Sequence, residues 1–333
     1  MNKNVLITGA TGLVGSHLVI ELIKAGGYSV HCAVRSEKSL EKLHKVCHSA
    51  GVDYSGITVH VMELGSCNSI FNLLKKCAIK VLYQCAAEVD LTNSSEERLI
   101  RNNVGLVSSI GEAMLRYSRE CDNEVLMVHI SSIAALGTVG QGEYVTEDTQ
   151  VSCLASMSPY GKSKFLSENV VWRYSKMGLR VVVVNPSVII GRSGGGGGLN
   201  AVYRLLSKGL PFYTGAQMGF VGVRDVVRAL RMLSESSVGV GRRYILNSHN
   251  MEYRDFIGLF NRHCGRRAPW IRVSRWVLCC GLWAVGVVAR LRGVEPMISI
   301  SMIGFMTDRV LYDGGRIVRE LDGFSYSGEL EIF

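Results

Sequence analysis

The sequence contains no hydrophobic run long enough to cross a lipid bilayer. Its longest apolar stretch, Trp276 to Ala289, has 14 residues, whereas a membrane-spanning helix needs about 20. The N-terminus does not resemble a signal peptide, because Thr8 and Gly9 interrupt its apolar residues early and no cleavage-like tail follows. We therefore expect a cytoplasmic protein.

Cysteine pairs with the spacing of metal ligands are also missing. None of the ten cysteines forms a Cys-x-x-Cys pair, and Cys279 and Cys280 are merely adjacent. Most stand in apolar runs, as Cys32 and Cys85 do, which is typical of buried, reduced thiols in a cytoplasmic protein. The spacing does not favour a zinc site, so we expect no metal.

The basic residues form no dense block, although the formal net charge is +9. A nucleic-acid-binding protein would show a clustered basic footprint, so we expect no nucleic-acid partner. Attraction of an anionic cofactor accounts for the positive charge. The length of 333 residues, 47% of them apolar, predicts one large globular domain or a domain with a smaller companion.

The first half of the chain alternates short β-branched runs with helical patterns such as 13–24 and 39–47. The expected strands are 5–7, 29–34, 57–62, 80–83, 125–130 and 180–184, and a later strand is expected at 244–246. This alternation predicts a parallel sheet covered by helices on both faces. Right-handed crossovers then give an α/β, doubly wound fold of the Rossmann type.

We predict a dinucleotide-binding core in residues 1–190, to which residues 219–247 return. A smaller, mostly helical substrate-binding lobe would comprise 191–218 and 248–333. Five consecutive glycines at 194–198 interrupt the second half. Because glycine loses the most entropy on ordering, they predict a loop, either a plain surface linker or a segment that closes over substrate.

Three glycines at intervals of three residues, Gly9, Gly12 and Gly15, follow the first strand and open the first helix. Glycine is needed where backbone turns sharply, approaches a pyrophosphate or lets helix and strand pack closely, and the helix N-terminus offers N–H groups to phosphates. The strand–turn–helix context favours a dinucleotide site over a plain turn. The residues expected to contact the cofactor here are Thr8, Gly9, Thr11, Gly12, Leu13, Val14 and Gly15.

The end of the second expected strand indicates which dinucleotide binds. An acidic residue usually stands there to bind the free 2′-hydroxyl of the adenosine ribose, but this chain has Arg35 and Ser36, with Lys38 nearby. A cation and a hydroxyl suit a 2′-phosphate better. We therefore predict a preference for NADP(H), with NAD(H) left open because Glu37 lies between these residues.

Tyr160 and Lys164 are four residues apart, so they share one face of a helix. An adjacent ammonium favours the phenolate and lowers the pKa of a tyrosine, which makes it a workable proton donor or acceptor for an alcohol–ketone pair. Ser131 and Ser132 end an expected strand at the edge where such sheets bind ligands, and a hydroxyl there can bond a substrate oxygen. His129, inside that strand, is interpreted as a core histidine.

Together these motifs resemble the extended short-chain dehydrogenase/reductase superfamily, also called the NAD-dependent epimerase/dehydratase family, and are similar to bacterial dihydroflavonol-4-reductase-like proteins. Other segments agree in order, and they are 84–87, 103–105, 185–187, 220–226 and 243–246. The resemblance covers about residues 3–325 and identifies Ser132, five residues before Gly137, as the catalytic serine.

The resemblance implies further site residues. Those for the cofactor are Glu63, Leu64, Cys85, Ala86, Ala87, Asn103, Tyr160, Lys164, Pro186 and Ser187. Those for the substrate are Glu88, Val89, Asp90, Ser132 and Tyr160. The family's usual Gly-Asp-Leu after the third strand is replaced by Glu63, Leu64 and Gly65 after Met62, which changes the expected adenine contacts.

The resemblance implies an NAD(P)-dependent oxidoreductase acting on CH–OH groups of a small-molecule carbonyl or alcohol. Tyr160 would donate the proton, Lys164 would lower the pKa of Tyr160 and bind the nicotinamide ribose, and Ser132 would orient the carbonyl. The alternatives are an NAD-dependent sugar-nucleotide epimerase or dehydratase and, less favoured, a non-enzymatic dinucleotide-binding regulator. A homodimer is left open by the family.

The segment 272–292 leaves two interpretations open. Arginines flank its apolar middle, and three of the four tryptophans, Trp270, Trp276 and Trp283, lie in or near it. It is either a buried helix of the substrate lobe or a peripheral helix on a membrane surface, which would give access to a lipid-like or steroid-like substrate.

Overall fold

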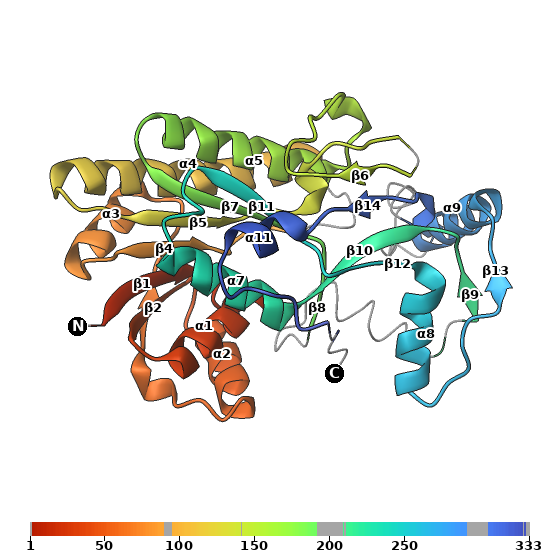
Figure 1. Cartoon of the computed structure of the whole chain (residues 1–333), viewed down its shortest axis with the longest axis horizontal. Helices are drawn as coiled ribbons and strands as arrows, with labels where there is room; N and C mark the ends of the chain where they lie inside the picture. Colours follow the sequence, from red (N-terminus) through yellow and green to blue (C-terminus); the bar gives the residue numbers. More distant parts are fainter. Residues whose placement is uncertain are drawn as a thin grey trace.

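A seven-stranded, all-parallel sheet forms the centre of the molecule (Figure 1). The computed structural model describes residues 2–89, 95–140, 142–191, 209, 211–291, 306–328 and 330. The strands, in spatial order, are β11 (Arg242–Leu246), β7 (Arg180–Pro186), β5 (Leu126–Ile130), β4 (Val81–Gln84), β1 (Lys3–Thr8), β2 (Tyr28–Val34) and β3 (Ile57–Val61). The predicted strands are therefore confirmed, and they pair as the doubly wound fold requires.

Helices cover both faces of this sheet, and each face has its own hydrophobic core. One face carries α1 (Leu13–Ala25), α2 (Lys38–Ser49) and α7 (Val223–Glu235), and the other carries α3 (Cys67–Lys76), α4 (Glu96–Glu120) and α5 (Pro159–Lys176). Short 3₁₀ helices occur at η1 (Tyr54–Gly56), η2 (Ile133–Ala135) and η3 (Leu154–Ser156). The predicted α/β Rossmann-type architecture is confirmed.

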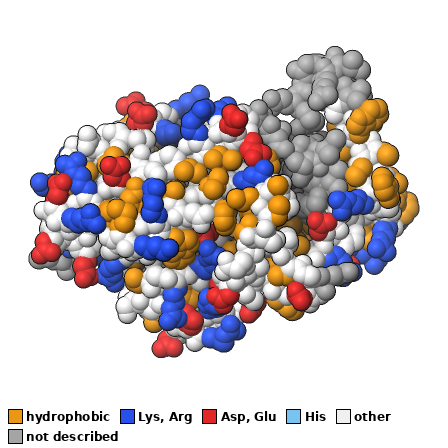
Figure 2. Space-filling model, turned by 90° about the horizontal axis from the view of Figure 1, so that it is seen from above, with side chains coloured by type: hydrophobic (Ala, Val, Ile, Leu, Met, Phe, Trp, Pro, Cys, Tyr) orange, Lys and Arg blue, Asp and Glu red, His pale blue; other side chains and the backbone are white. Residues whose placement is uncertain are grey.

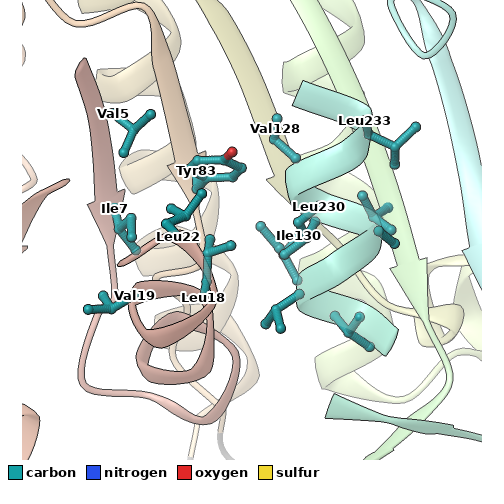
Figure 3. Packing of buried hydrophobic residues seen from close by; sticks show 14 of the residues in the cluster. Val5, Ile7, Leu18, Val19, Leu22, Tyr83, Val128, Ile130, Leu230 and Leu233 are labelled. Atoms are coloured by element: carbon teal, nitrogen blue, oxygen red, sulfur yellow. The ribbon is translucent and has the colours of Figure 1, made fainter. Parts of the chain in front are cut away.

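The alternation of side chains along β1 explains why both faces are covered. Val5 and Ile7 point to the face with α1 and α7, whereas Leu6 points to the opposite core. Figure 3 shows Leu22 of α1 and Leu230 of α7 packing on the same side of the sheet. A strand buried on both faces reads as a continuous apolar run, which is what the sequence has at this position.

The smaller lobe contains a three-stranded mixed sheet of β12 (His249–Glu252), β10 (Gln217–Gly222) and β8 (Val188–Ile190). The helix α8 (Tyr253–His263) packs on it, and the ring of Phe256 stacks on Phe220 with centroids 4.4 Å apart. The remaining elements are β9 (Phe212–Tyr213), which pairs with β13 (Ile271–Arg272), and α9 (Arg275–Leu291).

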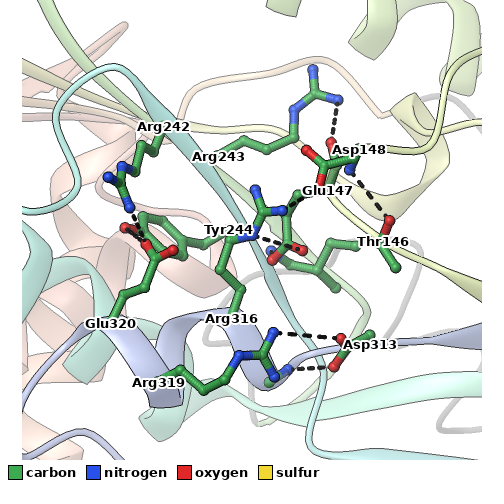
Figure 4. A network of polar contacts seen from close by, with 12 residues as sticks. Thr146, Glu147, Asp148, Arg242, Arg243, Tyr244, Asp313, Arg316, Arg319 and Glu320 are labelled. Atoms are coloured by element: carbon green, nitrogen blue, oxygen red, sulfur yellow. Dashed lines mark hydrogen bonds and ion pairs between the residues drawn. The ribbon is translucent and has the colours of Figure 1, made fainter.

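The C-terminal segment returns to the central sheet. The strand β14 (Leu311–Tyr312) pairs with β6 (Tyr144–Val145), and α11 (Gly315–Glu320) places Ile317 in the core beside β11. The carboxylate of Glu147 accepts a hydrogen bond from the backbone N–H of Ile245 at 3.0 Å and pairs with Arg316 at 3.4 Å (Figure 4). Residues 315–326 therefore pack on the dinucleotide-binding core, although the predicted division assigns them to the smaller lobe; the division itself stays a prediction.

The cysteines are less buried than expected. All ten are free thiols, but only Cys32 and Cys47 are buried, and Cys153 and Cys280 are exposed. Within the described part of the chain, no helix combines the length and apolarity needed to cross a membrane. The five-glycine segment at 194–198 lies outside the described residues.

Candidate functional site

The predicted cofactor turn lies where the carboxyl ends of β1 and β4 meet, at the point where the strand order reverses. Gly9 has a φ of +68°, and a Cβ on it would lie 2.7 Å from the backbone nitrogen of Ala86 and 2.9 Å from the carbonyl carbon of Cys85. Only glycine allows this approach. The structure therefore brings the glycine turn and the segment after β4, both predicted to bind the cofactor, into direct contact at a typical ligand position of such sheets.

The same turn closes tightly on the start of α1. The N–H of Gly12 donates to the carbonyl of Gly9 at 2.9 Å, and a Cβ on Gly15 would lie 2.2 Å from that carbonyl oxygen. Gly12 caps α1 without any side chain, and no acidic residue stands in the first turn. Thr11, Leu13 and Val14 are partly buried at this end. The bare helix N-terminus behind a glycine cradle suits a pyrophosphate.

Thr8 links the two segments of the cradle. Its hydroxyl donates to the carbonyl of Tyr83 and accepts from the N–H of Ala86, both at 3.4 Å. Cys85, Ala86 and Ala87 are partly buried after β4. The predicted cofactor residues at the ends of β1 and β4 thus form one continuous surface.

The predicted adenosine end of the site lies at the ends of β2 and β3. Arg35, Ser36 and Lys38 are exposed, and Glu37 is exposed between them. The N–H of Met62 donates to the carbonyl of Val34 at 2.9 Å and holds the two strand ends together. Glu63 and Leu64 follow directly, with Leu64 buried and Glu63 exposed. Both predicted adenosine segments are therefore neighbours.

Ser132, Tyr160 and Lys164 come together beside the cofactor cradle. Tyr160 and Lys164 lie on one face of α5, and Ser132 follows β5 and caps the short helix η2. The hydroxyl of Ser132 approaches the phenol of Tyr160 closely enough to lower its pKa. The ammonium of Lys164 donates to the carbonyl of Ile130 at 2.9 Å, and its side chain is buried. The structure thus brings Ser132 near Tyr160, on the helix that carries Lys164, and the catalytic roles of the three residues stay a prediction.

The electrostatics of this group differ from the expectation. Burial raises the pKa of Tyr160 to about 12, and the hydrogen bond from Ser132 only partly opposes that shift. Burial also lowers the pKa of Lys164 to about 8, against the attraction of Cys85 and Glu168. Desolvation disfavours both charged forms and is the largest cause of both shifts. Tyr160 is consequently protonated at neutral pH, which is the form that can donate a proton.

Glu168, one helical turn beyond Lys164, was not predicted from the sequence. Its carboxylate is 2% exposed and accepts hydrogen bonds from the hydroxyl of Ser131 at 2.8 Å and the amide of Asn185 at 2.9 Å. It also pairs with Arg243 and accepts from the indole of Trp172 at 3.2 Å. The amide of Asn185 bonds the carbonyl of Ser132 at 3.0 Å as well. Glu168 therefore holds in place the segment that carries Ser132, the predicted catalytic serine.

Asn103 holds neighbouring elements together in this structure, and its predicted contact with the cofactor stays a prediction. Its amide oxygen accepts from the N–H of Glu88 at 2.8 Å, and its amide nitrogen donates to the carbonyl of Glu88 at 3.0 Å and to Ser163 at 3.2 Å. Ser163 in turn donates to the carbonyl of Tyr160 at 2.9 Å. Asn103 thus clamps α4, α5 and the segment after β4 together.

Of the three predicted substrate residues after β4, the structure describes Glu88 and Val89. The carboxylate of Glu88 is held by Asn102 at 2.8 Å and Arg98 at 3.1 Å, both on α4. Val89 is 59% exposed. Asp90 lies outside the described residues. Their contact with substrate stays a prediction.

The loop after β7, which is predicted to contact the cofactor, is anchored at both ends. Pro186 is buried as the last residue of β7, and the hydroxyl of Ser187 donates to the carbonyl of Leu246 at 3.0 Å. The hydroxyl of Ser187 therefore fixes this loop to the end of β11 in this structure. The amide oxygen of Asn185 is buried and has no hydrogen-bond partner among the described residues.

His129 lies in the core, where it was interpreted to be, and is 1% exposed. Burial, together with the charge of Lys164, lowers its pKa well below the usual value. A second histidine group lies apart from the site. The Nδ1 atom of His31 and the Nε2 atom of His60 are 3.1 Å apart, and the sulfur of Cys77 is 4.0 Å from that Nε2. Burial lowers the pKa of both imidazoles, so the neutral rings hydrogen-bond to each other.

Comparison with known proteins identifies the family of this chain. A model of the NAD dependent epimerase/dehydratase family matches residues 5–246. The chain belongs to that family. The resemblance inferred from the motifs is thereby confirmed, and members of this epimerase/dehydratase family are NAD(P)-dependent oxidoreductases, epimerases or dehydratases.

Curated members of the epimerase/dehydratase family with different names are similar to this chain. A protein of Synechocystis, provisionally named a dihydroflavonol 4-reductase, is 25% identical over 95% of this chain and 88% of its own length. Sterol demethylase protein B of Methylococcus capsulatus is 27% identical over 80% of this chain and 76% of its own. UDP-glucose 4-epimerase of Mus musculus is 29% identical, but over only 51% of this chain and 48% of its own.

The fold of the epimerase/dehydratase family is shared over nearly the whole chain. The solved structure of UDP-glucose 4-epimerase from Thermotoga maritima, with UDP-glucose, superposes with a TM-score of 0.73. The match covers 99% of this chain and 95% of that one at 16% identity. At that identity the likeness concerns the fold.

We expect Glu168→Gln to lower the free energy of unfolding by about 2–3 kcal/mol, because it leaves the largely buried guanidinium of Arg243 without its carboxylate. Chemical denaturation measures this change. Glu120→Gln is the matched control, since it removes an exposed carboxylate paired with Arg116 on α4 and should change stability by less than about 0.5 kcal/mol. Equal stability of the two variants would show that Glu168 is not a structural centre.

The pKa of Lys164 predicts a pH dependence of dinucleotide binding. Because that pKa is lowered to about 8, the ammonium is charged below pH 8 and neutral above it. A charge-assisted hydrogen bond is about twice as strong as a neutral one, so the dissociation constant of the dinucleotide should rise by about 3- to 10-fold through pH 8. Titrations followed by tryptophan fluorescence measure it. Lys164→Met should abolish the dependence and Lys162→Met, on the same helix, should keep it; a pH-independent native protein contradicts the prediction.

Proposed function

We propose that this protein is an NADP(H)-dependent oxidoreductase that reduces the ketone or aldehyde of a small molecule, or oxidises the corresponding alcohol. The observation that carries the proposal is the approach of the Ser132 hydroxyl to the phenol of Tyr160, which shares helix α5 with the buried ammonium of Lys164. These groups lie at the carboxyl edge of the sheet, next to a glycine cradle that a Cβ would fill. A positioned phenol, hydroxyl and ammonium next to a dinucleotide site suit carbonyl chemistry.

The residues present fit a dinucleotide. The glycine turn would hold its pyrophosphate, and the segments 85–87 and 186–187 would border its nicotinamide half. When bound, the reduced dinucleotide supplies a hydride to the carbonyl carbon. Tyr160, protonated at neutral pH, gives its proton to the carbonyl oxygen, and Ser132 orients that oxygen by a hydrogen bond. Lys164 would bind the nicotinamide ribose, as the family resemblance implies.

The preference for NADP(H) rests on the end of β2. Arg35, Ser36 and Lys38 are all exposed there, where an adenosine ribose lies in such folds. A guanidinium and an ammonium favour a 2′-phosphate by charge-assisted hydrogen bonds. Glu37, exposed in the same turn, opposes that charge and keeps NAD(H) as the alternative.

An NAD-dependent sugar-nucleotide epimerase or dehydratase is the second candidate, because UDP-glucose 4-epimerases are among the relatives. The oxidoreductase is favoured because the reductase and sterol-directed relatives match about three quarters of the chain or more, whereas the mouse epimerase matches half. A non-enzymatic regulator is disfavoured, since it has no need of an assembled Ser132, Tyr160 and Lys164. The homodimer and the cytoplasmic location stay predictions.

We expect Tyr160→Phe to lower the rate of carbonyl reduction by at least about 100-fold, since general acid catalysis contributes about 10²–10⁴. The affinity for NADPH should change by less than about 3-fold, because the variant lacks only a hydroxyl. The assay follows NADPH absorbance with dihydroflavonol, sterol and aliphatic ketones. UDP-glucose conversion without net change in absorbance, by a protein purified with NAD, would instead establish the epimerase.

Arg35→Ala should weaken NADPH binding by about 10- to 100-fold and leave NADH binding nearly unchanged, because a hydrogen bond to a charged group contributes about 1.5–3 kcal/mol. The dissociation constants of both dinucleotides, measured by calorimetry, test this. Arg119→Ala, an exposed arginine at the far end of α4, is the control and should alter neither. If the native protein binds NADH more tightly than NADPH, the assignment of the cofactor is wrong.

A further inference from the structure

The positive charge of this chain is concentrated in one segment of the smaller lobe. Residues 256–294, here called the arginine–tryptophan segment, contain seven of the 37 basic residues and none of the 28 acidic ones. The segment therefore carries +7 of the chain's formal net charge of +9. All seven basic residues are arginines, and three of the chain's four tryptophans are here as well. The proposed reaction uses none of them.

The structure exposes the large apolar side chains of this segment. Trp276 is 82% exposed, Trp283 is 64% exposed and Trp270, just before β13, is 70% exposed. Val277 and Val285 on α9 are also more than half exposed. The interpretation of α9 as a buried helix therefore does not hold for these side chains. An exposed apolar group of this size marks an interaction site.

The exposed tryptophans lie on one face of α9. Trp276, Cys280 and Trp283 are spaced by four and three residues, so they line one side of the helix, and all three are exposed. Leu278, Cys279 and Leu282, on the other side, are partly buried. The helix thus rests on the protein with one side and presents indole rings with the other.

Exposed arginines are spread along this segment. They are Arg262, Arg266, Arg267, Arg272 and Arg275 in the part of the segment whose side chains are described. Arg275 pairs at 3.5 Å with Asp308, which is itself more than half exposed. Figure 2 shows hydrophobic and basic side chains side by side at the end of the molecule that carries α9 and β13 in Figure 1. Aromatic rings with adjacent cations are typical of a peptide segment at a lipid–water interface.

We propose that the exposed face of α9 binds the surface of an anionic lipid bilayer, with the helix lying along that surface. The indoles of Trp276 and Trp283 enter the headgroup region, and the exposed guanidinium groups of the arginine–tryptophan segment, beginning with Arg275 on the same helix, pair with acidic phospholipids. A second copy of the chain fits this face poorly. A twofold interface would set the same acid-free, +7 segment against itself, and like charges in contact repel.

Vesicle co-sedimentation of the full-length protein tests the proposal. The vesicles are phosphatidylcholine alone and phosphatidylcholine with phosphatidylserine, each at low and high salt. We expect binding to the anionic vesicles to exceed binding to the neutral ones by at least about 10-fold at low salt, and to weaken at high salt because ions screen the arginines. A blue shift of tryptophan fluorescence should accompany it.

A double variant, Trp276→Ser with Trp283→Ser, should reduce anionic-vesicle binding by at least about 10-fold. The matched control is Met177→Ser with Val238→Ser, which removes two apolar side chains that are 46% and 41% exposed elsewhere on the protein; it should bind as the native chain does. Circular dichroism and NADPH binding should be unchanged in both variants. These readouts separate membrane binding from folding and from the proposed reaction, on which this inference does not depend.

Two results would overturn the proposal. One is native protein that stays in the supernatant with anionic vesicles, or whose binding the tryptophan variant does not alter. The other is a dimer, detected by light scattering, that the tryptophan variant dissociates while neither protein binds vesicles. In that case the face is a contact between two copies of the chain.

Discussion

Glu168 places a negative charge in the interior, between the ends of β5, β7 and β11 and the middle of α5. A buried carboxylate is costly unless it is fully paired, and here Ser131, Asn185 and Arg243 all donate to it. Asn185 also holds the backbone of Ser132. The serine segment, the Tyr160–Lys164 helix and the loop after β7 are therefore fixed relative to one another by one group. A buried carboxylate whose hydrogen-bond donors come from several elements in this way rigidifies its surroundings.

The features that the sequence predicted well are those that short-range patterns determine. The alternation of β-branched runs and helical stretches predicted the seven strands and their parallel direction. The spacing of Gly9, Gly12 and Gly15 predicted a tight turn. In the structure, a Cβ at Gly9 or Gly15 would collide with neighbouring backbone atoms. Tyr160 and Lys164, four residues apart, had to share a helix face. Each of these rests on neighbours within one turn or strand, where backbone geometry leaves few choices.

The features that the sequence did not reveal depend on distant contacts. Arg243 and Glu168 are 75 positions apart, and nothing in the local pattern distinguishes Glu168 from a solvated helix residue. The side-chain amide of Asn103 hydrogen-bonds to Glu88 and Ser163. The motif that contains Asn103 does not specify these internal contacts. The pKa of Tyr160 was misjudged for the same reason. The adjacent Lys164 is visible in the sequence, whereas the burial that raises the pKa of Tyr160 to about 12 arises only in the fold.

The position of the basic residues and their exposure give a different explanation of the net positive charge from the one that composition suggested. Composition alone attributed +9 to attraction of an anionic cofactor, and Arg35 and Lys38 at the end of β2 are consistent with part of that. Outside residues 256–294, however, acidic and basic residues nearly balance. Attraction of a cofactor therefore accounts for little of the excess positive charge. The excess lies on the smaller lobe beside exposed indoles. Because long-range attraction depends on where charge is placed, the field of this protein would orient its smaller lobe, not its cofactor edge, toward an anionic surface.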